Sequence, residues 1–227
     1  MKLQKLTGGY ELLWHPDVIS FYNYLLEEYE VPNDKKIALF LPCAATKPYS
    51  QSRTHKKVIE TIQKSCGSQK YLIHELIISE PLGIVPRELE KKYPAAHYDM
   101  VLDTWFPINE IQEIRKTDYN DIFGIRKNSK EEYRLKRKIV NILSERVAKY
   151  LLKTKNNYNY YIGYVRSTHK EILEIAGKIA NIDVDFILNK ELVKRISSEK
   201  GRFYWIMNGL RCEESLSELD NRLKIKQ

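Results

Sequence analysis

Apolar residues are spaced along this chain in two ways, one typical of buried strands and the other of amphipathic helices. Short apolar runs predict strands, and they cover residues 36–41, 71–79, 156–165 and 184–188. Apolar residues at helical spacing predict helices, and these cover residues 15–30, 55–65, 131–154, 167–180, 191–197 and 214–227. Because strands alternate with helices, we expect an α/β fold, a three-layer sandwich with a central, mostly parallel sheet.

Other segments have weaker patterns. Residues 80–99 are typical of a proline-rich loop with a short helix that begins near Pro86, and residues 203–210 are an apolar segment of ambiguous type. Thr168 and Glu171 have the spacing of a capping box at the start of a helix.

The domain organisation follows from length and from the absence of a long linker. A chain of 227 residues can bury one substantial core. We therefore expect a single α/β domain over residues 1–227, with a motif-bearing core at 35–110 and a helical and α/β part at 111–227. The sequence has no apolar run long enough to span a membrane and no signal-peptide pattern, so we expect a cytoplasmic protein.

Three polar segments follow predicted strands, at residues 42–50, 79–88 and 165–169. In open, mainly parallel sheets, ligands bind at the carboxyl ends of the strands. These segments are therefore expected to converge on one pocket for a small molecule or a nucleobase.

The chain carries a formal net charge of +8, and its isoelectric point is near 9.2. An excess of lysine and arginine is typical of proteins that bind nucleic acid, although a lysine-rich, solvated surface gives the same number. Charge alone leaves both interpretations open.

The cysteines and glycines carry no motif for a disulfide framework, a metal or a nucleotide cofactor. Cys43, Cys66 and Cys212 are widely spaced, and no C-x-x-C pair is present. His74 and Glu75 form an H-E pair without the second histidine that a zinc helix needs. With no phosphate-binding loop either, we predict neither a metal nor another cofactor.

The segment after the first long strand offers groups for covalent chemistry. Cys43 lies near Lys47 and near a predicted helix start, where positive charge favours a thiolate nucleophile. A small buried hydrophobic residue is the alternative for a free cysteine. His55 has a pKa range suited to proton transfer, although a histidine at a helix start is often a cap or surface residue.

These residues belong to a longer pattern, PCAATKPYSQSRTH, which resembles the signature of archaeosine synthases: Pro-Cys, three residues, Lys-Pro-Tyr, two residues, Ser, two residues, His. The matching positions are Pro42, Cys43, Lys47, Pro48, Tyr49, Ser52 and His55. A second block, SEPLGIVPRELEKKYPAAHYD, is also similar to that family. Asp103, Thr104 and Trp105 stand where the family continues toward a Gly-Trp pair, which leaves the exact substrate open.

The resemblance implies an enzyme that acts on tRNA carrying preQ0, a deazaguanine nitrile, at position 15. Such an enzyme adds free lysine across the nitrile and forms an amidine, in a transferase- or lyase-type step of archaeosine biosynthesis. A radical-SAM partner then cleaves the adduct. The resemblance also suggests kinship with uracil-DNA glycosylases. Full-length members carry transglycosylase-like and PUA domains, so this chain is expected to be a short form that works with separate chains of those types.

The residue roles are expectations from the resemblance and from side-chain chemistry. The expected catalytic residues are Cys43, Lys47 and His55. The expected substrate-binding residues are Pro42, Tyr49, Ser50, Ser52, Glu80, Arg87, Glu88, His97 and Asp99. Basic residues of the long helix are expected to contact tRNA phosphates, namely Arg134, Lys136, Arg137 and Lys138.

A different class of function is also consistent with the sequence. The chain could be a non-catalytic subunit that binds tRNA or a base for a separate transglycosylase-like chain. A glycosylase-like nucleobase enzyme is a third, weaker alternative. The presence of Cys43, Lys47 and His55 together favours catalysis, because a binding module needs none of them.

Overall fold

A five-stranded sheet lies at the centre of the fold, with the strand order β4-β3-β2-β6-β7. The computed structural model describes residues 4–100 and 130–225, so Asp103 to Trp105 lie outside the described residues. Four of the strands are parallel, and β4 pairs antiparallel to β3. The strands are β2 (Ile37–Pro42), β3 (Ile73–Ser79), β4 (Gly83–Pro86), β6 (Tyr160–Gly163) and β7 (Asp185–Phe186).

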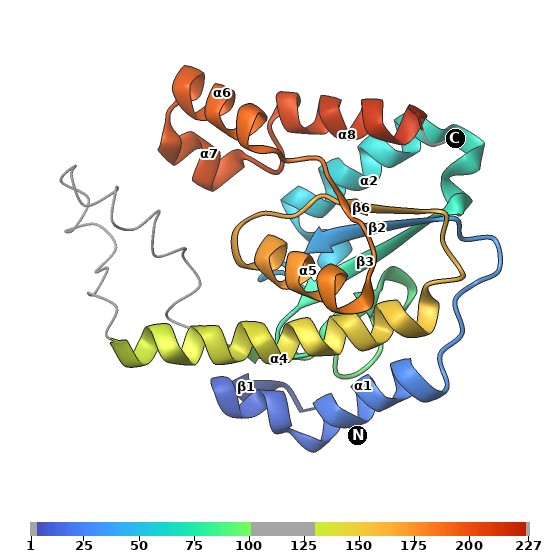
Figure 1. Cartoon of the computed structure of the whole chain (residues 1–227), viewed down its shortest axis with the longest axis vertical. Coiled ribbons are helices and arrows are strands. Elements are labelled where there is room, and N and C mark those ends of the chain that lie inside the picture. Colours follow the sequence, from blue (N-terminus) through green and yellow to red (C-terminus); the bar gives the residue numbers. More distant parts are fainter. Residues whose placement is uncertain (1–3, 101–129, 226–227) are drawn as a thin grey trace.

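Helices cover both faces of this sheet (Figure 1). One face carries α1 (Pro16–Glu27), α4 (Lys130–Thr154) and α5 (Ser167–Ala180). The other face carries α2 (Arg53–Cys66), α6 (Lys190–Lys200), α7 (Arg202–Asn208) and α8 (Glu213–Ile225).

Strand β2 contributes residues to two hydrophobic cores, one on each face of the sheet. Ala38 and Phe40 pack with the apolar sides of α1, α4 and α5, whereas Leu39 and Leu41 pack with those of α2 and α8. Successive strand residues point to opposite faces, so a strand buried on both sides is apolar throughout. The predicted three-layer α/β class with a mostly parallel sheet is confirmed.

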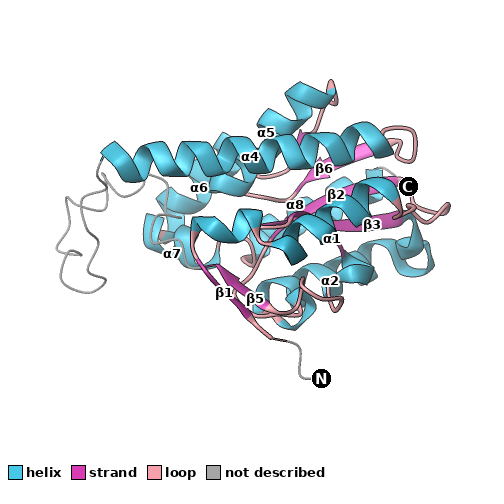
Figure 2. Cartoon of the chain, turned by 90° about the horizontal axis from the view of Figure 1, so that it is seen from below, coloured by secondary structure: helices cyan, strands magenta, loops and turns pink. Residues whose placement is uncertain are grey.

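Two parts of the chain differ from the sequence-based prediction. Residues 80–99, expected to be a loop, contain β4, which folds back along β3 after a turn at residues 80–82 and begins at Gly83, a residue with φ of +86°. Two short strands also pair in parallel beside the main sheet, β1 (Leu6–Gly8) and β5 (Tyr98–Met100) (Figure 2). Runs of three or four residues carry too little periodicity to be recognised as strands.

Helix starts show one correct and one wrong prediction. Pro16 occupies the first turn of α1 as expected, because its missing N–H is not needed there. The capping box at Thr168 and Glu171 is wrong. Helix α5 begins at Ser167 with Arg166 as its N-cap, two residues before the predicted cap, so Thr168 lies buried inside its first turn and Glu171 pairs instead with Arg137.

Shorter 3-10 turns join these elements: η1 (Tyr10–Trp14), η2 (Tyr49–Gln51), η3 (Gly67–Leu72) and η4 (Arg87–Leu89). The turn η4 is the short helix expected near Pro86. Within the described residues, no helix combines the length and the apolar character needed to cross a membrane.

Candidate functional site

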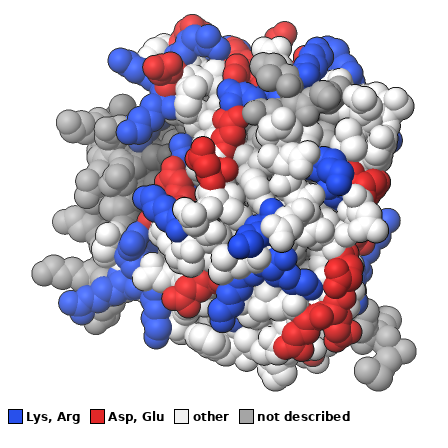
Figure 3. Space-filling view, turned by 45° about the vertical axis from the view of Figure 1, so that its right-hand side comes forward, with Lys and Arg blue, Asp and Glu red and all other residues white. Residues whose placement is uncertain are grey.

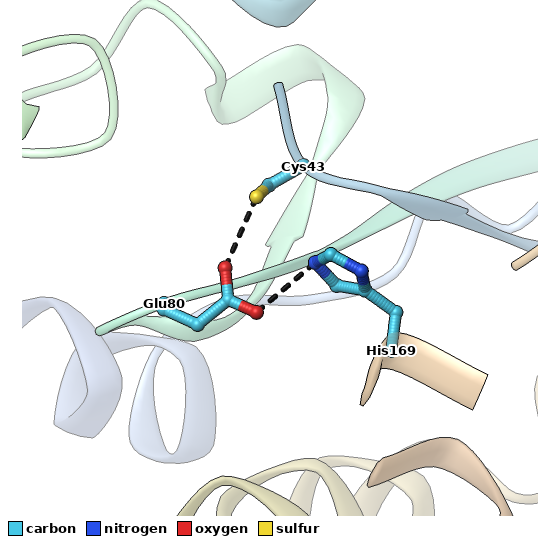
Figure 4. Close-up of side chains that lie close together, drawn as sticks. All are labelled: Cys43, Glu80 and His169. Atoms are coloured by element: carbon cyan, nitrogen blue, oxygen red, sulfur yellow. Dashed lines mark hydrogen bonds and ion pairs between the residues drawn. The ribbon is translucent and has the colours of Figure 1, made fainter. Parts of the chain in front are cut away.

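Three side chains meet at the carboxyl ends of the parallel strands, each from the segment that follows a different strand (Figure 4). Cys43 follows β2, Glu80 follows β3, and His169 lies in the first turn of α5, after β6. The Cys43 Sγ donates a hydrogen bond to Glu80 Oε2 at 3.0 Å. The second oxygen, Oε1, lies 3.0 Å from His169 Nε2. We call these three residues the Cys–Glu–His cluster.

Burial and charge set the protonation of this cluster. Burial, together with the charge of Glu80 and the hydrogen bond to it, raises the pKa of the Cys43 thiol well above its usual range, and Lys47 offsets this only in part. Burial alone would raise the pKa of Glu80, but the charge of His169 and the hydrogen bonds from His169 and Cys43 lower it. The resting pair is therefore a thiol donating to a carboxylate, and the thiolate expected from the sequence is wrong.

Lys47 lies beside the cluster and over an aromatic ring. Its Nζ is 4.1 Å from the centroid of the Tyr98 ring and 3.4 Å from the carbonyl oxygen of Ala44. Burial lowers the pKa of Lys47, while the nearby Cys43 and the negative charges of Asp99 and Glu80 oppose that shift. Lys47 is thus a cation close enough to the thiol to act on it electrostatically.

A buried group of hydroxyls supports this loop. The Tyr49 hydroxyl lies 2.8 Å from Ser79 Oγ and 2.9 Å from the Tyr98 hydroxyl, and Ser79 also contacts Tyr98. All three side chains are buried, so each hydroxyl needs a partner to offset its lost hydration. Tyr49 therefore fixes the signature loop against β3 and β5.

His55 has both ring nitrogens occupied. Nδ1 lies 2.7 Å from Nη2 of Arg87, which can only donate, so Nδ1 accepts and Nε2 donates to the Pro42 carbonyl at 2.9 Å. Burial and the Arg87 charge lower the pKa of His55 to about 4. His55 therefore holds the end of β2 beside Cys43, as a neutral ring without a nitrogen available for the cluster.

Two serines of this segment, Ser52 of the signature and Ser50, also make structural contacts. The Ser52 hydroxyl caps α2 by accepting a hydrogen bond from the backbone N–H of His55 at 3.2 Å. The backbone N–H of Ser50 donates to Glu90 Oε2 at 2.9 Å.

The second motif block divides between the site and its surroundings. Arg87 is engaged by three partners: its Nε and Nη2 donate to Glu75 Oε2 at 3.0 and 2.5 Å, its Nη1 donates to Glu90 at 2.9 Å, and Nη2 also donates to His55. Glu88 contacts Tyr29 and lies 3.3 Å from His74 Nε2. Because β4 runs antiparallel, it carries these residues away from Cys43, back toward the middle of β3.

The other two residues expected to bind substrate, Asp99 and His97, make no direct contact with the Cys–Glu–His cluster in the described part of the chain. Asp99 is exposed and pairs with Lys5 at 3.1 Å, and its negative charge also acts to raise the pKa of Lys47. His97 packs its ring 5.7 Å from that of Tyr93, and its buried Nδ1 has no hydrogen-bond partner in the described part of the chain.

The basic residues of α4 differ in their surroundings. Arg134 is exposed, whereas Arg137 pairs with Glu171 of α5. Lys138 places its Nζ 5.2 Å from the centroid of the Tyr10 ring, and Lys136 is half-buried.

Sequence reasoning placed Cys43 and Glu80 at one site but did not assign His169. The segment 165–169 was expected to reach the pocket, yet a histidine that follows a serine and a threonine gave no motif. One donor atom each from Cys43, Glu80 and His169 lies within 4.8 Å of the others, so the cluster could also supply metal ligands. The three residues lie far apart in the sequence, so a motif of closely spaced ligands could not reveal them.

The fold and the site define the class of this protein: an α/β protein that carries a partly buried thiol beside a buried carboxylate at the carboxyl ends of its parallel strands. Residues 18–127 match the family described as "Domain of unknown function (DUF5591)". Over this region the chain resembles archaeosine synthases, as its signature predicts. The similarity is to that part of those proteins alone.

Two relatives named "Archaeosine synthase subunit alpha" are similar to this domain. The protein from Thermoplasma acidophilum is 47% identical over 102 residues, which are 44% of this chain and 19% of the relative. The protein from Methanosarcina acetivorans is 48% identical over 96 residues, 42% of this chain and 15% of the relative. The "Archaeosine synthase" of Haloferax volcanii is 37% identical over 86 residues, 38% of this chain and 13% of the relative. The matched region thus spans less than a fifth of each relative.

A solved structure shares the fold over more of the chain. The crystal structure of AF0587, a protein of unknown function, matches with a TM-score of 0.51 and 20% identity, over 90% of this chain and 49% of that one. This similarity concerns the fold alone. The suggested kinship with uracil-DNA glycosylases stays a prediction.

Proposed function

We propose that this protein takes part in archaeosine biosynthesis, by adding the amine of free lysine to the nitrile of preQ0 in tRNA. The observation that carries the proposal is the direct contact, at 3.0 Å, between the thiol of Cys43 in the family signature and the carboxylate of Glu80 in the second motif block. A nucleophile paired with a base is the arrangement that covalent catalysis requires.

In the first step, Cys43 Sγ attacks the nitrile carbon and one π bond of the nitrile breaks. Glu80 accepts the thiol proton and returns it to the nitrile nitrogen, giving a thioimidate. His169 holds Glu80 in its charged, proton-accepting form. Lys47 stabilises the negative charge that develops on the nitrogen.

In the second step, the lysine amine attacks the thioimidate carbon, and the carbon–sulfur bond breaks. The proton released by the amine goes through Glu80 to the departing sulfur, which restores the thiol. The sum is a nitrile plus an amine giving an amidine, so no oxidant, reductant or other co-reactant is needed.

The surrounding residues have different roles in this scheme. Arg87 and His55 position the loop through their mutual contact and through the Pro42 carbonyl, rather than touching substrate. Asp99 is the exposed carboxylate near Lys47, and we assign to it the charged groups of the lysine substrate. Arg134 and Lys138 on α4 contact the tRNA backbone, and a further subunit completes the enzyme, in line with the "subunit alpha" names of two relatives.

The test is an incubation of the protein with lysine and preQ0-containing tRNA, followed by mass spectrometry of the nucleosides. We expect an adduct with lysine but not with glutamine, and none from Cys43→Ala or Cys43→Ser. Without lysine, the wild-type protein should gain a covalent mass that lysine then releases.

A matched variant separates the two attack routes. Loss of activity in Lys47→Met together with an active Cys43→Ala would contradict covalent catalysis and favour direct attack by the amine. No adduct from any protein, with a partner chain supplied, would favour the non-catalytic binding subunit.

A further inference from the structure

Two basic hollows lie on either side of helix α7. The first has a volume of about 400 Å³ and is lined by Arg53, Lys56, Lys57 and Arg211, with Glu60 as its one acidic residue in the described part of the chain. The Lys57 Nζ pairs with Glu60 at 2.9 Å, which leaves the other three cations unbalanced by that carboxylate.

The second hollow, of about 270 Å³, is lined by Arg166, Lys170, Lys190 and Lys194, with no acidic residue among its described lining. Consecutive residues of α7 line the two hollows, Tyr204 the first and Trp205 the second. The surface formed by the two hollows and α7 is called the α7 surface below.

Basic residues predominate in the lining of the α7 surface, and Glu60 is the one acidic residue among the described lining residues. On the face shown in Figure 3, basic and acidic side chains are mixed. Lys56, Lys190 and Lys194 are exposed, and none has an acidic partner within ion-pair distance in residues 4–100 and 130–225. Cations left without partners around two adjacent hollows suit a ligand with several negative charges.

The first turns of α2 and α5 line the α7 surface, and the same two helices follow the strands that lead to the Cys–Glu–His cluster. The first hollow is lined by the first turns of α2, the helix that contains His55. The second is lined by the start of α5, where Ser167 and Lys170 flank His169 in sequence. Arg166 also donates to the carbonyl oxygens of Trp205 and Ile206, at 2.8 and 2.5 Å, and so ties α7 to the start of α5.

We propose that the α7 surface binds the phosphate backbone of RNA, with neighbouring phosphates in the two hollows and a base against the Tyr204 ring. Basic side chains beside an aromatic ring are the combination that holds single-stranded nucleic acid, because rings stack on bases while cations meet phosphates. This inference rests on the proposed function for the identity of the RNA as tRNA. It assigns RNA contact to α2, α5, α6 and α7, in addition to α4.

The test compares two doubly substituted proteins that carry the same change in net charge. Lys56→Glu with Lys194→Glu alters the α7 surface. Lys64→Glu with Lys178→Glu is the control, because these exposed lysines lie in the last turns of α2 and α5, at the opposite ends of the helices. Thermal melting confirms that both proteins fold.

The measurement is binding of an unmodified tRNA transcript over a range of salt concentrations, without lysine or preQ0. At about 0.1 M salt we expect the first variant to bind about tenfold more weakly, with the slope of log K against log salt smaller by about 1.5, because two phosphate contacts are lost. The control should stay within about twofold of the wild type. Tyr204→Leu should weaken binding by about fivefold with an unchanged salt slope.

Equal losses in the two double variants, or no loss in either, would overturn the proposal. So would binding of polyglutamate as tight as that of tRNA, since it would assign the surface to acidic protein. Because the assay contains no reacting group, its result is independent of whether the protein forms the lysine adduct.

Discussion

Replacing Glu80 with glutamine separates reactivity of the Cys43 thiol from catalysis. The amide has the same shape as the carboxylate, but it carries no charge and accepts no proton. Glu80 is 5% exposed and touches both Cys43 and His169 at 3.0 Å, so bulk water has little room to replace it as a base. The two consequences of this change run in opposite directions.

Catalysis should fall. A positioned general base contributes about 10²–10⁴-fold, so adduct formation by Glu80→Gln should drop by that factor, which is about 3–5 kcal/mol in the barrier. Burial, the largest cause of the raised pKa of Cys43, persists in this variant, but the carboxylate that adds to it is gone while Lys47 still lowers that pKa, so alkylation of the thiol should rise. A unit charge at about 4 Å is worth about 4 kcal/mol at an effective dielectric constant near 20, so even its partial loss should speed alkylation by about tenfold.

The assay measures both quantities on the same protein. Iodoacetamide at pH 8 modifies the protein, and peptide mass spectrometry follows each cysteine separately. Cys66 and Cys212 are buried and serve as internal controls that report unfolding. Adduct formation is followed in parallel by nucleoside mass spectrometry. Glu80→Asp keeps the negative charge but moves it away from Cys43 by one methylene. Its rates of adduct formation and of alkylation should therefore lie between those of the wild type and of Glu80→Gln.

Near-normal adduct formation in Glu80→Gln would refute its role as the base. A fall in both activity and alkylation would refute the electrostatic argument, because it would show that Glu80 keeps the thiol accessible rather than protonated.

Three further outcomes follow from the contacts described. Arg87→Met should lower the free energy of unfolding by about 3–5 kcal/mol in urea titrations, because Glu75 and Glu90 would be left without their cation in a largely buried place, and a loss below about 1 kcal/mol would contradict this. His55, with a folded pKa of about 4 against about 6.5 unfolded, contributes stability above pH 6.5 that is lost as the pH falls toward 4. The protein should therefore be about 2 kcal/mol less stable at pH 5 than at pH 7.5, and a His55→Gln variant should show a flatter profile; parallel profiles would mean that His55 is not the titrating group. The Cys–Glu–His cluster makes direct contacts at 3.0 Å, so we expect elemental analysis to find well below one equivalent of zinc and chelators to leave activity unchanged, whereas stoichiometric zinc would assign the cluster as a metal site.

The sequence predicts the layers of this fold better than its small strands. Apolar runs such as β2 are continuous because both faces of the sheet are covered, and that pattern is readable. Strand β4 has four residues, and only its pairing with β3 identifies it as a strand. Its antiparallel direction is a tertiary property, and it decides that Arg87 and Glu88 leave the site.

The candidate site shows the same limit. The meeting of Cys43 and Glu80 could be predicted, because the ends of adjacent parallel strands lie together. The state of the thiol could not, since it depends on burial and on which neighbour is nearer, the carboxylate or Lys47. His169 is a single histidine without a motif, and it becomes significant only when α5 places it against Glu80.

The short strands at the two edges of the main sheet limit how this chain can associate with a second protein chain. In the described part of the chain, the sheet ends in β4, with four residues, and in β7, with two. Exposed strand edges invite pairing between chains, and short edge strands are one way in which proteins prevent aggregation and unwanted β-sheet extension. A partner subunit should therefore dock on helices and loops, and a complex held by its side chains is expected to dissociate and re-form without breaking the sheet.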